Sequence, residues 1–181
     1  MILSLLVTGG VDLLLPPKKT KQYITTLYVY DANDGYPSYF LINENHGKSF
    51  RDATESSGLL NKRFRRTYSA SFVDLDEDGH LDLLKVNDFA GFDLFYNNGK
   101  GVFRNVTQEK VNKSSLFGMA HSFGDFNKDG FPDLYICSDY AQPDLLFMNN
   151  GNKTFTNKTE PNLKHITYFS MGNEVTDVNN D

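Results

Sequence analysis

A short acidic motif recurs along the chain at a nearly fixed interval. The segment FVDLDEDGHLDLL at residues 72–84 returns as FGDFNKDGFPDLY at residues 123–135, and VTDVNND opens a further copy at residue 175. The leading aspartates, Asp74, Asp125 and Asp177, lie 51 and 52 residues apart. A period of this size is the signature of a repeat architecture, in which each repeat is one supersecondary unit. We therefore expect an array of similar units.

The side chains of the motif suit a hard cation. Carboxylates or amides occupy three alternate positions, a glycine follows in the turn, where it most easily adopts a positive φ, and an aspartate closes the motif. The predicted side-chain ligands are Asp74, Asp76, Asp78 and Asp82 in the first copy, and Asp125, Asn127, Asp129 and Asp133 in the second. A backbone carbonyl near His80 or Phe131 would complete the set.

Oxygen donors in a flexible loop favour calcium, which takes roughly six to eight oxygen ligands. No cysteine or histidine lies at ligand spacing in the sequence, which argues against zinc and copper. The alternative is an acidic turn that binds nothing, and the repetition of the motif in phase argues against it. The first loop carries four carboxylates and the second carries three, so we expect the first to bind calcium more tightly.

An EF-hand is the main competing calcium motif, and it needs a bidentate glutamate at loop position 12. That position holds Lys85 in the first copy and Ile136 in the second. The segments that follow the loops, at residues 82–86 and 133–137, are rich in apolar and β-branched residues and are typical of short strands. The sequence therefore predicts cation loops inside β-hairpins.

Asn-Gly turns form a second series of landmarks, out of phase with the first. The segments YNNGKGVF at residues 96–103 and MNNGNKTF at 148–155 match each other, and residues 42–50 are a longer version. Asn-Gly between apolar runs is a strong hairpin signal. Four strands per period follow, in the best copy at residues 118–126, 131–138, 144–148 and 154–158. This is the unit of a β-propeller blade, so the predicted fold is all-β: a partial β-propeller of four-stranded antiparallel blades.

The predicted blades cover residues 1–66, 67–115 and 116–167, with a partial blade at 168–181. The first is degenerate, because Ser4, Leu6 and Thr8 align with the three leading ligand positions, and we expect no metal there. A basic cluster precedes the second blade, and we interpret it as a solvated face, with a docking site for an acidic partner or glycan as the alternative. Its members are Lys62, Arg63, Arg65 and Arg66.

Composition narrows the functional classes. The 181-residue chain carries a net charge of −5, and the two complete loops hold eight of its 23 acidic residues. Nucleic acid is therefore an unexpected partner. No apolar run approaches transmembrane length. Residues 2–7 are apolar but lack the flanking features of a signal peptide, and we expect them to form a strand of a truncated repeat. The single Cys137 is expected to be a buried free thiol.

Catalysis is not indicated by the sequence. Its four histidines, His46, His80, His121 and His165, are scattered and none forms a visible pair with a nucleophile. His121 falls on an inner strand and could face the channel of a propeller, but we expect a packed or solvated side chain. No catalytic or cofactor-binding residue is predicted.

The loops, the Phe-Gly before Asp125 and the NNG turns resemble FG-GAP/VCBS repeats, which are found in integrin α-subunit propellers. The segment FGMAHSFGDFNKDGFPDLY at residues 117–135 is most similar to the branch found with ASPIC/UnbV domains and in cartilage acidic protein. This resemblance implies a calcium-stabilised propeller, commonly of seven blades, outside the cytoplasm: secreted, at the cell surface or, in a bacterium, periplasmic. It also implies that Asp177, Asn179 and Asp181 begin a third metal site, whose glycine and closing aspartate are missing from the sequence. Three and a half blades would then be part of a longer chain that supplies the rest of the propeller.

The predicted function is a non-catalytic, calcium-stabilised extracellular module for binding or adhesion, with a protein or glycan ligand. One alternative is a propeller scaffold domain of a larger secreted enzyme, with the active site elsewhere. Another is an intracellular structural repeat that binds no metal.

Overall fold

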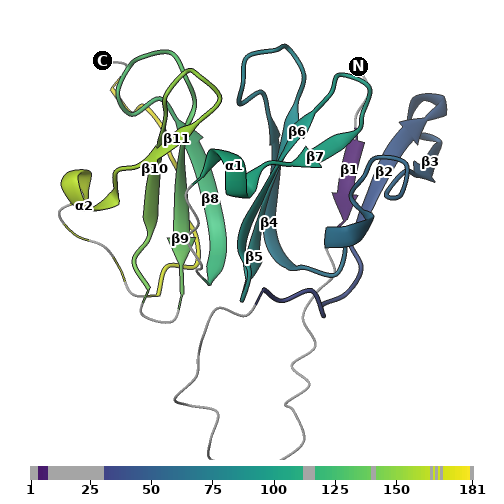
Figure 1. Ribbon diagram of the computed structural model, residues 1–181, viewed down its shortest axis with the longest axis horizontal. Helices are drawn as coiled ribbons and strands as arrows, with labels where there is room; N and C mark the ends of the chain where they lie inside the picture. The colour runs from purple at the N-terminus through teal and green to yellow at the C-terminus, as the bar shows by residue number, and fades with distance from the viewer. Residues whose placement is uncertain are drawn as a thin grey trace, which may run out of the picture.

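Three antiparallel sheets stand side by side in chain order in the computed structural model of the protein (Figure 1). The structure describes residues 4–7, 31–111, 117–139, 142–163, 165, 167 and 169–179. Two residues of the predicted loops, Thr8 and Asp181, lie outside this part of the chain.

The central and third sheets have the same topology. The central sheet contains β4 (Arg66–Val73), β5 (Asp82–Asp88), β6 (Gly91–Asn97) and β7 (Phe103–Asn105), in sequence order. The third sheet contains β8 (Gly118–Gly124), β9 (Asp133–Ser138), β10 (Leu145–Asn149) and β11 (Phe155–Asn157), again in sequence order. Every neighbouring pair is antiparallel. The prediction of an all-β fold made of four-stranded, blade-like sheets is confirmed.

The first sheet departs from the predicted alignment. Within the described residues it has three strands, β1 (Ser4–Val7), β2 (Tyr39–Glu44) and β3 (Ser49–Asp52). Strand β1 pairs with β2 as β5 pairs with β6, so it takes the second-strand position. Placing Ser4 and Leu6 at leading ligand positions is therefore wrong, because both residues lie in this strand. The blade boundaries stay a prediction.

The described residues also contain four short helices outside the sheets: η1 (Asn45–Gly47), η2 (Leu60–Lys62), α1 (Thr107–Lys110) and α2 (Thr159–Asn162). Within the part of the chain that the structure describes, no helix is long and apolar enough to span a bilayer.

The central sheet is buried on both faces. Leu84 of β5 belongs to an apolar cluster shared with the third sheet, whereas Leu83 belongs to a cluster shared with the first sheet. Aromatic rings meet edge to face in both: Phe92 and Phe147 at 5.5 Å between centroids, and Phe40 and Phe103 at 5.4 Å. Successive strand residues point to opposite faces, so a strand covered on both sides needs a continuous apolar run.

One member of the basic cluster is buried and the other three are half-buried, which corrects the interpretation of the cluster as a solvated face. Arg65 is only 1% exposed, and its guanidinium contacts Asp93 at 3.0 Å, Asp31 at 2.6 Å and the carbonyl of Ala32 at 2.6 Å. A buried guanidinium requires such partners, because desolvating an unpaired charge is very costly. Asp93 also accepts hydrogen bonds from Asn87 and Asn105.

The other members of the cluster are also engaged. Arg66 forms two hydrogen bonds with Asp34, at 3.0 and 2.9 Å. Arg63 lies over the ring of Tyr39, 4.8 Å from its centroid. Lys62 lies 3.4 Å from Asp93. The cluster therefore ties the segment before the central sheet to the sheet itself.

We predict that Asp93→Ala lowers the free energy of unfolding by about 3–5 kcal/mol, because it leaves Arg65 buried without its main carboxylate partner. The partly exposed pair offers a matched control: Asp34→Ala should cost about 1 kcal/mol or less. Urea unfolding measures both values. Equal losses would show that the buried pair is not distinctive.

Candidate metal sites

Two loops share one backbone conformation. The first, residues 74–81, joins β4 to β5, and the second, residues 125–132, joins β8 to β9. Glu77 and Lys128, at matching positions, have φ values of 58° and 59°. Gly79 and Gly130, two residues further on, have φ values of 84° and 94°. The flanks are strands, as the argument against an EF-hand predicted.

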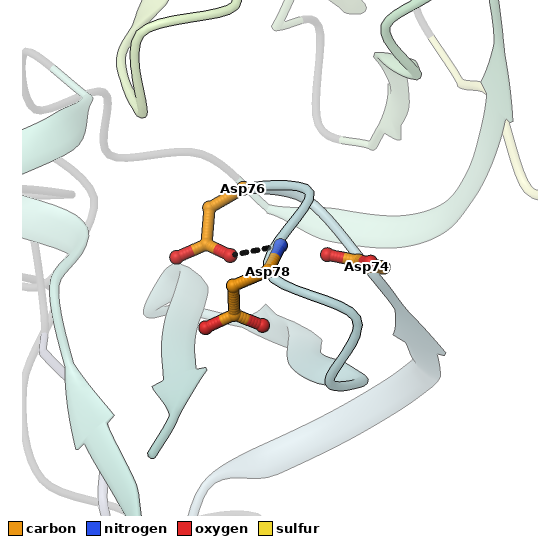
Figure 2. A group of neighbouring side chains, drawn as sticks. All are labelled: Asp74, Asp76 and Asp78. Carbon is orange, nitrogen blue, oxygen red and sulfur yellow. Dashed lines mark hydrogen bonds between the residues drawn. The ribbon is translucent and has the colours of Figure 1, made fainter. Parts of the chain in front are cut away.

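In the first loop, backbone N–H groups turn the carboxylates inward. Gly79 donates to Asp74 at 2.9 Å, Asp78 donates to Asp76 at 3.2 Å, and His80 donates to Asp78 at 2.9 Å. One oxygen from each of the three aspartates lies within 4.8 Å of the others, and Figure 2 shows them gathered around one turn. Three anionic groups this close repel one another unless a cation lies between them.

One candidate ligand atom in this group lacks a hydrogen-bond partner among the described residues. Oδ1 of Asp74 is buried and finds no hydrogen-bond donor among the described residues. A buried acceptor normally has a partner, and a lone carboxylate oxygen beside two more carboxylates is an environment that fits a divalent ion. The residues of the first loop therefore fit calcium.

The second loop is built in the same way, with one amide in place of a carboxylate. Gly130 and Asp129 donate their backbone N–H groups to Asp125 at 2.8 and 3.0 Å, and Phe131 donates to Asp129 at 2.9 Å. The Asn127 amide also donates to Asp129, at 2.7 Å. The neutral Asn127 and its hydrogen bond to Asp129 lower the repulsion among the acidic side chains of the second loop.

The third copy is only partly described. The backbone N–H of Asn179 donates to Asp177 at 3.2 Å, and both residues are exposed. A site at Asp177, Asn179 and Asp181 stays a prediction.

The closing aspartates have a structural role that the sequence did not reveal. Asp82 is fully buried, and it accepts backbone hydrogen bonds from Leu75 at 3.1 Å and from Asn97 at 2.9 Å. The loop and the Asn-Gly turn of one sheet are thereby joined through a single carboxylate. Burial raises the pKa of Asp82 to about 6. Each oxygen keeps a further lone pair, so ligation by Asp82 remains possible.

Asp133 repeats this arrangement in the third sheet. It accepts from the backbone N–H groups of Phe126 at 2.9 Å and Asn149 at 2.8 Å, and burial raises its pKa. In both four-stranded sheets, the closing aspartate thus links the acidic loop to the Asn-Gly turn.

Ring packing links the same two landmarks. A Cβ atom at Gly99 would overlap the His80 imidazole, and one at Gly151 would overlap the Phe131 ring. Both glycines also have positive φ, 77° and 68°. The sequence predicts only carbonyl ligands at His80 and Phe131. Both copies place a ring-bearing residue at nearly the same spacing from the glycine of the NNG turn, and this recurrence could have predicted the ring packing.

We predict that Asp133→Ala in EGTA lowers the free energy of unfolding by about 2–4 kcal/mol, since it leaves two inward N–H donors without an acceptor. Asp129→Ala removes an exposed carboxylate from the same loop and should cost about 1 kcal/mol or less under the same conditions. Chemical unfolding without metal tests this contrast. A small loss of unfolding free energy for Asp133→Ala would contradict its proposed structural role and leave ion binding as its predicted role.

His121 connects the inner strands of two sheets. Its Nδ1 lies 2.9 Å from the Ser69 hydroxyl and its Nε2 lies 2.8 Å from the Ser71 hydroxyl, both on β4. Burial lowers the pKa of His121 to about 4, so the ring is neutral at pH 7. The expectation that His121 packs is confirmed. Cys137 is a buried free thiol, as predicted, and burial raises its pKa to about 11.

This histidine predicts an acid sensitivity. Because the folded-state pKa of about 4 lies below the ordinary value of 6.5, the unfolded chain binds a proton first, and stability falls as pH drops from about 6.5 to 4. We expect this loss to be about 2 kcal/mol smaller in His121→Gln than in the parent protein. Unfolding in EGTA at several pH values tests it, with His46→Gln as the control. Parallel pH profiles for parent and His121→Gln would contradict the assignment.

The chain forms successive blade-like antiparallel sheets, and in two of them an acidic loop joins the first strand to the second. This arrangement defines a repeat protein of the β-propeller type. A family model described as FG-GAP-like repeat matches residues 74–136 and 125–181. The chain belongs to this family.

Two integrins are similar to part of the chain. Human (Homo sapiens) integrin alpha-6 is 32% identical over 116 residues, which cover 56% of this chain and 10% of the integrin. Chicken (Gallus gallus) integrin alpha-6 is 30% identical over 105 residues, covering 52% of this chain and 10% of the integrin. The chain therefore spans about a tenth of the length of these relatives.

One solved structure has a weaker similarity. It is the structure of an Agrocybe aegerita lectin that specifically recognises non-reducing terminal N-acetylglucosamine. The match has a TM-score of 0.37 and 19% identity, and it covers 66% of this chain and 31% of the lectin.

Proposed function

We propose that the protein is a calcium-stabilised, non-catalytic β-propeller module that binds ligands or supports adhesion outside the cytoplasm. The observation that carries the proposal is the convergence of Asp74, Asp76 and Asp78 within 4.8 Å, with one buried, unpaired oxygen among them. Membership of the FG-GAP-like family and the similarity to integrin alpha-6 support it.

The proposed ligand sets follow the repeat. Asp82 and the carbonyl of His80 would complete the first site. The second site would use the carbonyl of Phe131 together with the side chains of Asp125, Asn127, Asp129 and Asp133. The bound ion would supply the positive charge that cancels the repulsion between the carboxylates. Because a closing aspartate ties each loop to the Asn-Gly turn, ordering the loop would also stiffen the outer hairpin of the sheet.

An extracellular location suits sites of this kind. Calcium modules outside cells work with dissociation constants of about 10⁻⁴ to 10⁻³ M, because they meet abundant calcium. We propose a protein or glycan ligand that contacts loops of the propeller, with the other blades supplied by the rest of the full-length chain. A scaffold role in a larger secreted enzyme is the second candidate, and it would place the chemistry outside this segment.

Calcium should stabilise the protein. At a free calcium concentration of about ten to one hundred times Kd, each occupied site adds about 1.4–2.7 kcal/mol to the free energy of unfolding. We expect a higher melting temperature in calcium than in EGTA, a smaller difference in Asp74→Ala or Asp125→Ala, and the smallest difference in the double variant.

Glu55→Gln, which removes an exposed acid outside both loops, is the charge-matched control and should keep the full response. A melting temperature that does not change between calcium and EGTA would support the intracellular, metal-free alternative and refute the calcium proposal.

A further inference from the structure

A lysine from the third sheet reaches into the first metal loop. Nζ of Lys153 lies 2.8 Å from Oδ2 of Asp76, a residue 77 positions earlier in the chain. The Asp76 side chain is only 4% exposed, whereas that of Lys153 is 50% exposed. The ammonium is therefore the charged partner of a carboxylate that has almost no contact with solvent.

The backbone that carries Lys153 is held against the central sheet. The Tyr96 hydroxyl donates to the carbonyl of Lys153 at 3.3 Å, and the Asn149 amide donates to the carbonyl of Leu75 at 3.1 Å. Lys153 itself has a left-handed φ of 66°. With its turn docked at two further points, Lys153 reaches Asp76 from a fixed position.

Asp76 is thus shared between two uses. Its Oδ1 accepts the N–H of Asp78, as the dashed line in Figure 2 shows, and its Oδ2 pairs with Lys153. A divalent ion bound by the same carboxylates would repel this ammonium, because both are positive and only a few ångströms apart.

We propose that Lys153 is a built-in competitor of the divalent ion at the first loop, so that ion affinity and the contact between the central and third sheets are coupled. This inference rests on the proposed calcium function. Thermodynamic linkage requires the coupling to act in both directions. If Lys153 lowers the affinity of the loop for the ion, then binding of the ion weakens the ion pair between Lys153 and Asp76 by the same free energy. The lysine offsets one of the four carboxylates of the first loop, so that loop loses the advantage expected from its charge count.

Isothermal titration calorimetry with calcium tests the proposal on the protein carrying Asp125→Ala, which leaves the first loop to report. Adding Lys153→Met should tighten calcium binding about tenfold, a Coulomb effect kept modest by the half-exposed position of the lysine. Lys153→Arg keeps the charge and should bind calcium as the parent does. Lys48→Met, in the exposed turn of the first sheet, changes net charge equally and should have no effect.

The second loop supplies an internal control. In an Asp74→Ala background, Lys153→Met should leave calcium affinity unchanged, and an equal gain there would overturn a local competition. In EGTA, Lys153→Met should lower the melting temperature, while the rise on adding calcium becomes larger than in the parent.

The outcomes separate the two proposals. Equal affinity with and without Lys153 would overturn the competitor role and leave the calcium site standing. Absence of calcium binding in both Asp125→Ala proteins, with and without Lys153, would overturn the first-loop site and the inference together. Circular dichroism of each variant confirms that the sheets are folded.

Discussion

The buried carboxylate at the start of each second strand is the interaction on which the rest of the two four-stranded sheets depends. Asp82 and Asp133 each accept one N–H from the acidic loop and one from the Asn-Gly turn. Hydrogen bonds to an ionised acceptor in a water-poor environment are stronger than neutral ones, and both oxygens are used. The sheet therefore fixes the position of the loop, and the loop in turn positions the candidate ligands.

Much of the fold could be predicted from the sequence because its signals are local. Asn-Gly turns and apolar runs lie within a few residues of the strands that they specify, and the predicted strands of the third sheet, such as residues 131–138, match the observed ones closely. The first sheet could not be aligned reliably, because its repeat lacks the acidic motif. There the apolar strand β1 (Ser4–Val7) is placed by its pairing with β2, which no short pattern encodes.

Contacts between sheets could not be predicted from the sequence for a related reason. His121 meets Ser69 across 52 positions, and Lys153 meets Asp76 across 77. Nothing at either end of such a pair identifies its partner. Charge patterning was misleading in the same way: a run of basic residues is usually solvated, but the carboxylate of Asp93 allows Arg65 to be buried. The candidate ligands were visible because they share one loop, whereas the lysine that approaches them comes from another sheet.

The interface between the central and third sheets has two parts with different physics. Midway along the strands it is apolar, with Phe92 against Phe147 and both rings almost fully buried. At the loop edge it is polar, with the Asn149 amide on the carbonyl of Leu75 and an ammonium on Asp76. Apolar contacts respond little to ionic conditions, but charges at a partly exposed edge respond strongly. Under the proposed calcium function, a bound ion would alter the contacts at the loop edge, while the apolar packing would hold the two sheets together.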